Sequence, residues 1–219
     1  MDSQSDIVGM GYSGGAIAGG WAASLQSAYA PELNVKGWAI GGTPSNLSAT
    51  FYGLDAGLFA GFAAAGLAGV VDSYPEANDY VGSVITEEGN KALQFTREQC
   101  MGDIILGLRN VNILNQSFVS NTNNFLHADA IQGLLQTLTM GADPKLTPKA
   151  PVYMYHSVHD EVIPFAMANR TAKLCNPLWQ PDILGAKLTE VFNAVSNLFG
   201  TDVGRGDQIL KEHIQGGKF

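Results

Sequence analysis

The fold is decided by the stretch IVGMGYSGGAIAGGW, residues 7–21. A short apolar run enters a turn and then a helix of small residues, and Gly11-Tyr12-Ser13-Gly14-Gly15 within it fits the pattern G-x-S-x-G. This is the context of a nucleophile elbow, in which a strained turn holds a serine hydroxyl away from the sheet. We expect larger side chains at Gly11 and Gly15 to collide with the neighbouring helix and strand. The alternative interpretation is a glycine-rich turn before a helix.

Composition restricts the possible partners. The chain has 219 residues and is 46% hydrophobic, enough for one domain with a substantial core. Its net charge of −8 argues against nucleic acid, because phosphate binding requires a basic surface. The same charge disfavours docking on anionic membranes. The two cysteines, Cys100 and Cys175, are too few to define a compartment, and their spacing does not establish a disulfide.

Three short apolar runs bounded by turn residues predict buried strands of a parallel sheet. They are residues 6–10, 35–40 and 151–156. A helix over residues 13–29, ended by Pro31, joins the first two in a right-handed crossover. The prediction is therefore an α/β fold.

Residues 43–147 predict a mainly helical insertion, because this stretch is apolar, helix-prone and too long for a loop. Its clearest amphipathic helices are expected at 76–93 and 128–140. The uncharged run 56–71 is shorter than a membrane span needs, so we expect a buried or lipid-facing helical hairpin there. Residues 183–199 have helical spacing, within a tail (176–219) that is harder to place.

A serine nucleophile needs a base, and the base needs an acid to orient it. In α/β-hydrolases these residues follow the order Ser, Asp or Glu, His. Asp160 is the best acid, because it lies just past the third strand, and Glu161 is a weaker alternative. The alternative interpretation of Asp160 is an ordinary aspartate at a turn or a helix N-cap. Only His213 follows Asp160 and is the candidate base, although a tail histidine without a role is equally compatible. The backbone N–H of Gly14 is expected to be one oxyanion donor.

The remaining histidines are weaker candidates for the base. His127 falls in the helical insertion, and His156 ends a predicted strand. His159 adjoins Asp160, where neighbouring side chains seldom face each other well.

The chain resembles the fungal secretory lipases of the lipase A type over about residues 5–175. The resemblance rests on four stretches: GYSGG (11–15), YAPELNVKGWAIGGTP (29–44), GLFAGFAAAGLAGV (57–70) and PVYMYHSVHDEVIP (151–164). It implies an α/β-hydrolase fold with a helical lid over an acyl-binding tunnel, and hydrolysis of triacylglycerol esters. It also implies Ser13 as nucleophile and Asp160 as acid.

The chain departs from that family at both ends. Family members have a signal peptide and several strands before the elbow, and this chain begins with a polar, acidic segment instead. Their histidine falls at a place that corresponds to about Val191, where this chain has none. We therefore expect a chain shortened at its N-terminus, with an incomplete sheet and a divergent or displaced tail.

The sequence thus predicts a single α/β-hydrolase domain over residues 1–219 that cleaves lipid esters through an acyl-enzyme on Ser13. The alternative is a catalytically impaired fragment or lipid-binding protein. Neither a metal-ligand cluster nor a phosphate loop is found, so no cofactor is expected. The expected partner is a lipid ester at an oil–water interface, with no nucleic acid and no stable membrane span. We expect a monomer, secreted as the resemblance implies.

Overall fold

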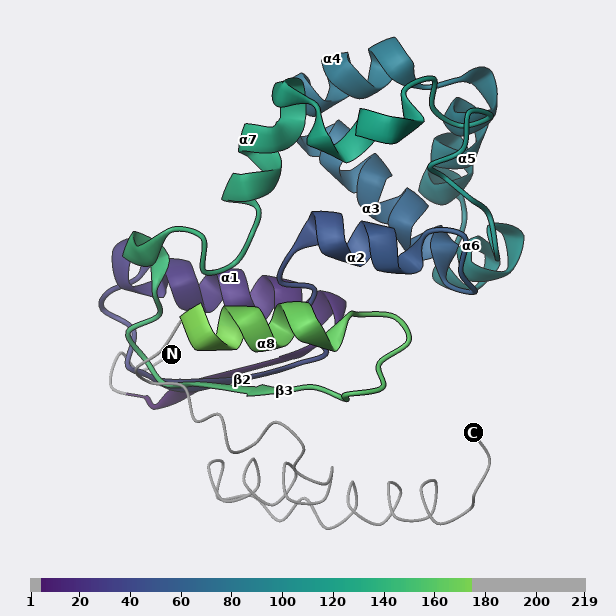
Figure 1. Ribbon diagram of the computed structural model, residues 1–219. Helices are drawn as coiled ribbons and strands as arrows, with labels where there is room; N and C mark the ends of the chain where they lie inside the picture. Colours follow the sequence, from purple (N-terminus) through teal and green to yellow (C-terminus); the bar gives the residue numbers. More distant parts are fainter. Residues whose placement is uncertain (1–4, 175–219) are drawn as a thin grey trace, which may run out of the picture. The chain divides into compact units, whose positions relative to one another are not determined.

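The computed structural model describes residues 5–174 of the chain (Figure 1). These residues form two compact units. The first unit contains residues 5–43, 144–159 and 168–174 of this range, and the second contains residues 44–143 and 160–167.

The first unit is built on a three-stranded parallel sheet in the order β1-β2-β3. Its strands are β1 (Ile7–Tyr12), β2 (Val35–Gly41) and β3 (Val152–Tyr155). All three predicted strands are present and parallel, and β1 extends to the residue before Ser13. The expected burial is wrong for β1, which lies at the edge of this sheet, contains no buried residue and leaves Met10 65% exposed. The register aligns Tyr12, Gly41 and Tyr155 across the sheet, so the three carboxyl ends meet at one edge.

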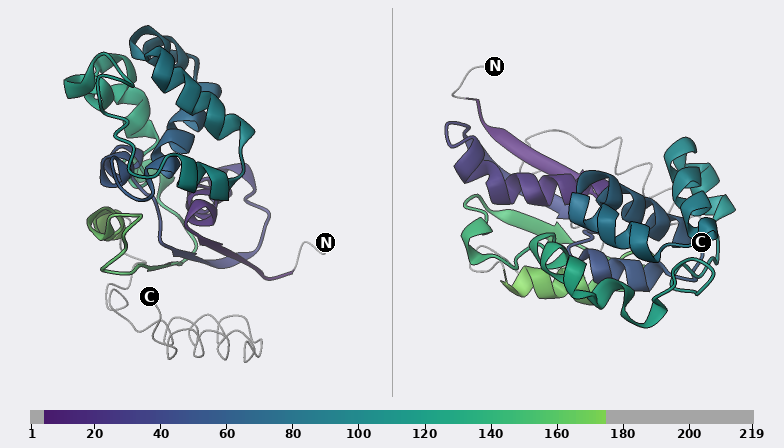
Figure 2. Two further views of the ribbon diagram at one scale, coloured as in Figure 1. Left: turned by 90° about the vertical axis from the view of Figure 1, so that its right-hand side faces the viewer. Right: turned by 90° about the horizontal axis from the view of Figure 1, so that it is seen from above.

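One face of this sheet is covered by the helices α1 (Gly14–Tyr29) and α8 (Phe165–Leu174) (Figures 1 and 2). Ala16 of α1 and Ala172 of α8 are both 0% exposed and form one cluster with Ile40 and Met154 of the strands. Small side chains let α1 approach closely, and a Cβ added at Gly19 would lie 3.2 Å from Ile40 Cγ2. The predicted helix 13–29 is thereby confirmed.

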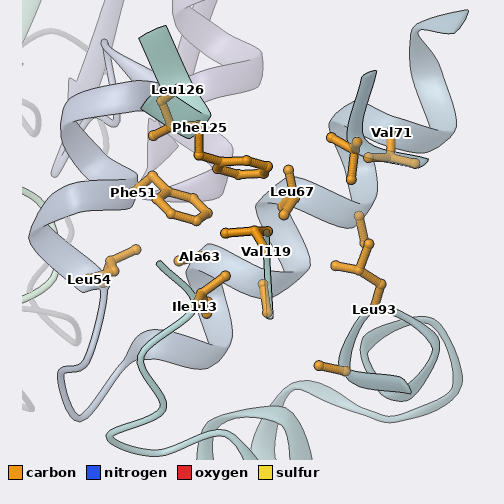
Figure 3. Packing of buried hydrophobic residues seen from close by; sticks show 14 of the residues in the cluster. Phe51, Leu54, Ala63, Leu67, Val71, Leu93, Ile113, Val119, Phe125 and Leu126 are labelled. Carbon is orange, nitrogen blue, oxygen red and sulfur yellow. The ribbon is translucent and has the colours of Figure 1, made fainter. Parts of the chain in front are cut away.

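The second unit is helical and has its own core. Its α-helices are α2 (Leu47–Leu54), α3 (Ala60–Ser73), α4 (Pro75–Val84), α5 (Glu87–Glu98), α6 (Met101–Gly107) and α7 (Asp129–Thr137). The 3-10 helix η1 (Thr122–His127) follows α6, and a second one, η2 (Pro144–Leu146), follows α7 and belongs to the first unit. Phe51, Leu67, Val71, Leu93 and Phe125 lie in one buried hydrophobic cluster (Figure 3).

Two helix predictions in this region were wrong. The stretch 76–93 is two helices, because Ile85 is extended and pairs with Val119, and Thr86 begins a new helix by accepting the N–H of Gly89. The run 56–71 holds one helix, α3, rather than a hairpin. A turn precedes it, with Ala56 at a φ of 57°.

The predicted helix 128–140 is shorter in the structure, as α7. The predicted helix 183–199 lies outside the described residues. Among residues 5–174, no helix combines the length and the apolar character needed to cross a membrane.

Candidate active site

Ser13 stands between β1 and α1 in a backbone conformation that side chains rarely adopt. Its φ is 53° and its ψ is −117°. A serine at a helix N-cap ordinarily accepts a hydrogen bond from the first turn, as Asn46 and Thr86 do at the starts of α2 and α5. Ser13 makes no such bond. Its hydroxyl is therefore not used to cap the helix.

Three backbone hydrogen bonds fix the elbow. The Ser13 N–H donates to the Gly41 carbonyl of β2 at 2.8 Å. The Ser13 carbonyl accepts the N–H groups of Ala16 and Ile17 at 2.9 and 3.1 Å. The serine is thus held both to the sheet and to the helix. Gly14 begins α1, where the first N–H groups have no partner within the helix and can bind an anion.

The glycine requirement is confirmed at Gly11 and wrong at Gly15. A Cβ at Gly11 would lie 2.1 Å from the Gly15 carbonyl oxygen and 2.9 Å from the Ala16 nitrogen. Since both are backbone atoms, α1 itself would have to move. A Cβ at Gly15 meets nothing within 4 Å in the part of the chain that the structure describes.

Aromatic rings pack beside the elbow at the carboxyl edge of the sheet. The rings of Tyr12 and Tyr155 are stacked, with centroids 6.1 Å apart. This contact requires glycine on β2, because a Cβ at Gly41 would lie 2.0 Å from the Tyr155 ring. Burial, with a smaller contribution from Tyr12, raises the pKa of the Tyr155 phenol above its ordinary value. Tyr155 therefore stays neutral at physiological pH.

Asp160 follows the carboxyl end of β3 and is fixed by its own loop. Its Oδ1 accepts the N–H groups of Val162 and Ile163 at 2.9 and 2.8 Å. Two such bonds hold the carboxylate in one orientation. Asp160 belongs to the second unit, whereas Ser13 belongs to the first.

The candidate base, His213, lies outside the described residues. His127 is exposed in the second unit and stacks on the Tyr52 ring, with centroids 5.9 Å apart. His159 is exposed, and its backbone N–H donates to the Ser157 hydroxyl at 3.3 Å. Of the candidate residues, the structure therefore describes the elbow at Ser13 and the orientation of the Asp160 carboxylate.

Thr43 is a buried polar residue that the sequence analysis did not single out. It is fully buried and follows the carboxyl end of β2. Its one sequence signal is its place in the turn Gly42-Thr43-Pro44 that ends a predicted strand.

Residues 5–174 contain no group of three or more histidine, cysteine or acidic side chains arranged to hold a metal ion.

In this fold a strand of a parallel sheet is followed by a strained serine and then by a helix. That arrangement is typical of the α/β-hydrolase class. The crystal structure of Candida antarctica lipase A in its closed state has this fold. It matches the chain with a TM-score of 0.72 and 34% identity, over 79% of this chain and 41% of that one. The crystal structure of a Legionella pneumophila protein matches at a TM-score of 0.62 and 18% identity, a likeness of fold alone.

The chain belongs to the secretory lipase family, whose profile matches residues 1–189. The secreted triacylglycerol lipase LIP5 of Malassezia globosa is 54% identical over 267 aligned positions, which span 98% of this chain and 56% of that protein. The secreted triacylglycerol lipase LIP3 of Malassezia restricta is 47% identical over 79% of this chain and 37% of its own length. The chain thus spans about half, or less, of the length of these relatives.

Proposed function

We propose that this chain hydrolyses carboxylic esters of lipids through a covalent acyl-enzyme on Ser13. In this proposal Asp160 orients the base, His213 is the base, and the Gly14 N–H is one oxyanion donor. The substrate is a triacylglycerol at an oil–water interface. Such an ester needs no metal or nucleotide, so the reaction requires no cofactor.

The single observation that carries the proposal is the backbone of Ser13. A serine in an ordinary N-cap would use its hydroxyl to stabilise the helix, and it would not need a positive φ. Here the strain is maintained by hydrogen bonds to β2 and α1, and the hydroxyl caps nothing. A strained conformation that leaves a hydroxyl available is the arrangement that nucleophilic catalysis requires.

The proposed reaction has two steps. The Ser13 hydroxyl attacks the ester carbonyl while the imidazole takes its proton, and the oxyanion that forms binds the Gly14 N–H. The imidazole then returns the proton to the leaving alcohol, and the acyl group stays on Ser13. Water attacks the acyl-enzyme by the same route and releases the fatty acid.

The preference for lipids is supported by the relatives and by the second unit. The relatives above are named triacylglycerol lipases. We propose that the helical insertion over residues 43–147 is a lid that binds the acyl chain. Each buried CH₂ contributes about 0.8 kcal/mol, so an apolar lid favours long chains. We also propose that the protein is a secreted monomer, since the relatives are named secreted lipases.

Hydrolysis of p-nitrophenyl esters by purified protein tests this function. Ser13→Ala should lower kcat by at least about 10³-fold, because the nucleophile is lost. Ser24→Ala, the same chemical change in α1, is the matched control and should leave kcat unchanged. Equal activity of Ser13→Ala and the unaltered protein would refute the assignment. Faster turnover of acetate esters than of long-chain esters would refute the lipid preference.

The alternative is a catalytically impaired lipid-binding protein, and one observation favours it. The alignment with LIP5 of Malassezia globosa has 267 positions, more than the 219 residues of this chain. That relative therefore carries residues within the aligned span that have no counterpart here. Binding of a fluorescent fatty acid, without ester turnover and equally by Ser13→Ala, would identify this function.

A further inference from the structure

The hydroxyl of Thr43 is a buried polar group that the elbow does not use. The Thr43 side chain is 0% exposed. Its Oγ1 has no hydrogen-bond partner among the residues that the structure describes. Burying an unpaired hydroxyl destabilises a protein, and valine would fill the same space without that cost. A threonine here therefore needs a hydrogen-bond partner that is not one of these residues.

The place of Thr43 in the fold indicates where that partner comes from. The Gly41 carbonyl accepts the Ser13 N–H at 2.8 Å, and the Gly42 N–H donates to the Tyr155 carbonyl at 3.0 Å. Gly42 then turns the chain with a φ of 53°. Thr43 thus follows directly on the residues that join the elbow to β3. In open α/β sheets this carboxyl edge is where ligands bind.

We propose that Thr43 is a binding residue of the hydrolytic site, and that its hydroxyl binds an oxygen atom of the reaction. That oxygen belongs either to the ester or to the water that attacks the acyl-enzyme, since a hydroxyl can donate to both. The inference rests on the proposed function of Ser13. It adds a polar contact from the turn that follows β2 to the contacts expected from the elbow between β1 and α1.

Thr43→Val and Thr43→Ser separate this role from a structural one in the full chain. Valine keeps the volume and removes the hydroxyl, and serine restores it. Thr171→Val is the matched control, because Thr171 is a buried threonine of α8 in the same unit. We measure the urea midpoint, the rate of Ser13 labelling by a fluorophosphonate, and the burst and steady-state phases of p-nitrophenyl ester hydrolysis.

If the inference is right, Thr43→Val keeps or raises the urea midpoint, because an unpaired hydroxyl is removed. It also slows one chemical step by about tenfold, the effect of one lost hydrogen bond. A slower labelling rate and burst phase identify the ester oxygen as the partner. A normal burst with a slower steady state identifies the attacking water. Thr43→Ser restores the rate in either case, and Thr171→Val does not change it.

Three results would overturn the inference. Both steps could proceed at the unaltered rate in Thr43→Val, so that the hydroxyl binds nothing in the reaction. The urea midpoint could instead fall, which would identify a structural partner, or serine could fail to restore the rate. If the unaltered protein is not labelled at Ser13, the proposed function fails and this inference fails with it. Equal labelling rates together with an unchanged steady-state rate of ester hydrolysis refute the role of Thr43 alone.

Discussion

Gly11→Ala should destabilise the first unit, because the new methyl group has no space. Its Cβ would lie 2.1 Å from the Gly15 carbonyl oxygen, 2.5 Å from the Gly15 carbonyl carbon and 2.9 Å from the Ala16 nitrogen. All three are backbone atoms, so α1 must move away from β1 by about 1 Å to restore ordinary contact distances. Overpacking of this kind costs about 1–3 kcal/mol. For a protein of this size, each kcal/mol lowers Tm by about 2–4 °C.

Gly15→Ala is the matched control within the same motif. Its Cβ meets nothing within 4 Å among the described residues, and alanine favours a helix by up to about 1 kcal/mol over glycine. Unfolding in urea is followed by tryptophan fluorescence, with Trp21 in α1 and Trp38 in β2. We expect a lower midpoint for Gly11→Ala and an equal or higher midpoint for Gly15→Ala. Equal midpoints for the two variants would refute the close approach of α1 to β1.

Three further predictions concern the acid, an ion pair and the helical core. Asp160→Asn should lower kcat by about 10³–10⁴-fold. It should cost little stability, since the amide oxygen can still accept both loop N–H groups. An unchanged kcat would exclude Asp160 as the acid. The hydrogen bonds from Arg97 lower the pKa of Asp72 below 3.8. Asp72→Asn should therefore destabilise the protein at pH 7, and the difference in urea midpoint should shrink and vanish as the pH falls through the lowered pKa of Asp72. A difference that stays constant with pH would contradict this. Phe125→Ala should lower the free energy of unfolding by about 3–5 kcal/mol, because Phe125 is 0% exposed and packs against Phe51. A change in the free energy of unfolding close to zero would contradict that packing.

The sheet and the elbow could be predicted because their signals are local. Each strand is a short apolar run between turn residues, and the strain at Ser13 was expected from the G-x-S-x-G pattern between a strand and a helix. The open space at Gly15 could not be predicted, since it depends on what lies beside α1. The same pattern therefore gave one correct and one incorrect steric argument.

The break between α4 and α5 also could not be predicted from the sequence. Apolar residues continue at helical spacing through Val81, Val84 and Ile85, so periodicity predicts one helix. The break depends on Val119, which pairs with Ile85 from far along the chain. Local patterns do not contain such a contact. The capping threonine at residue 86 was the available signal, because threonine is favoured at helix starts.

The orientation of the Asp160 carboxylate was partly visible in the sequence. An aspartate followed by backbone N–H groups in a turn is a common local arrangement. What the sequence could not supply is its distance from Ser13, which depends on long-range packing. Thr43 was missed because threonine is common in turns, and only its complete burial distinguishes it.

The most direct test of the central claim is the mass of the intact protein after treatment with a fluorophosphonate, followed by mapping of the modified peptide. An activated serine forms a covalent adduct, whereas an ordinary turn serine does not. We predict one adduct per chain, on Ser13, and none in Ser13→Ala. An unmodified protein, or an adduct on another residue that persists in Ser13→Ala, would contradict the assignment of Ser13 as the nucleophile.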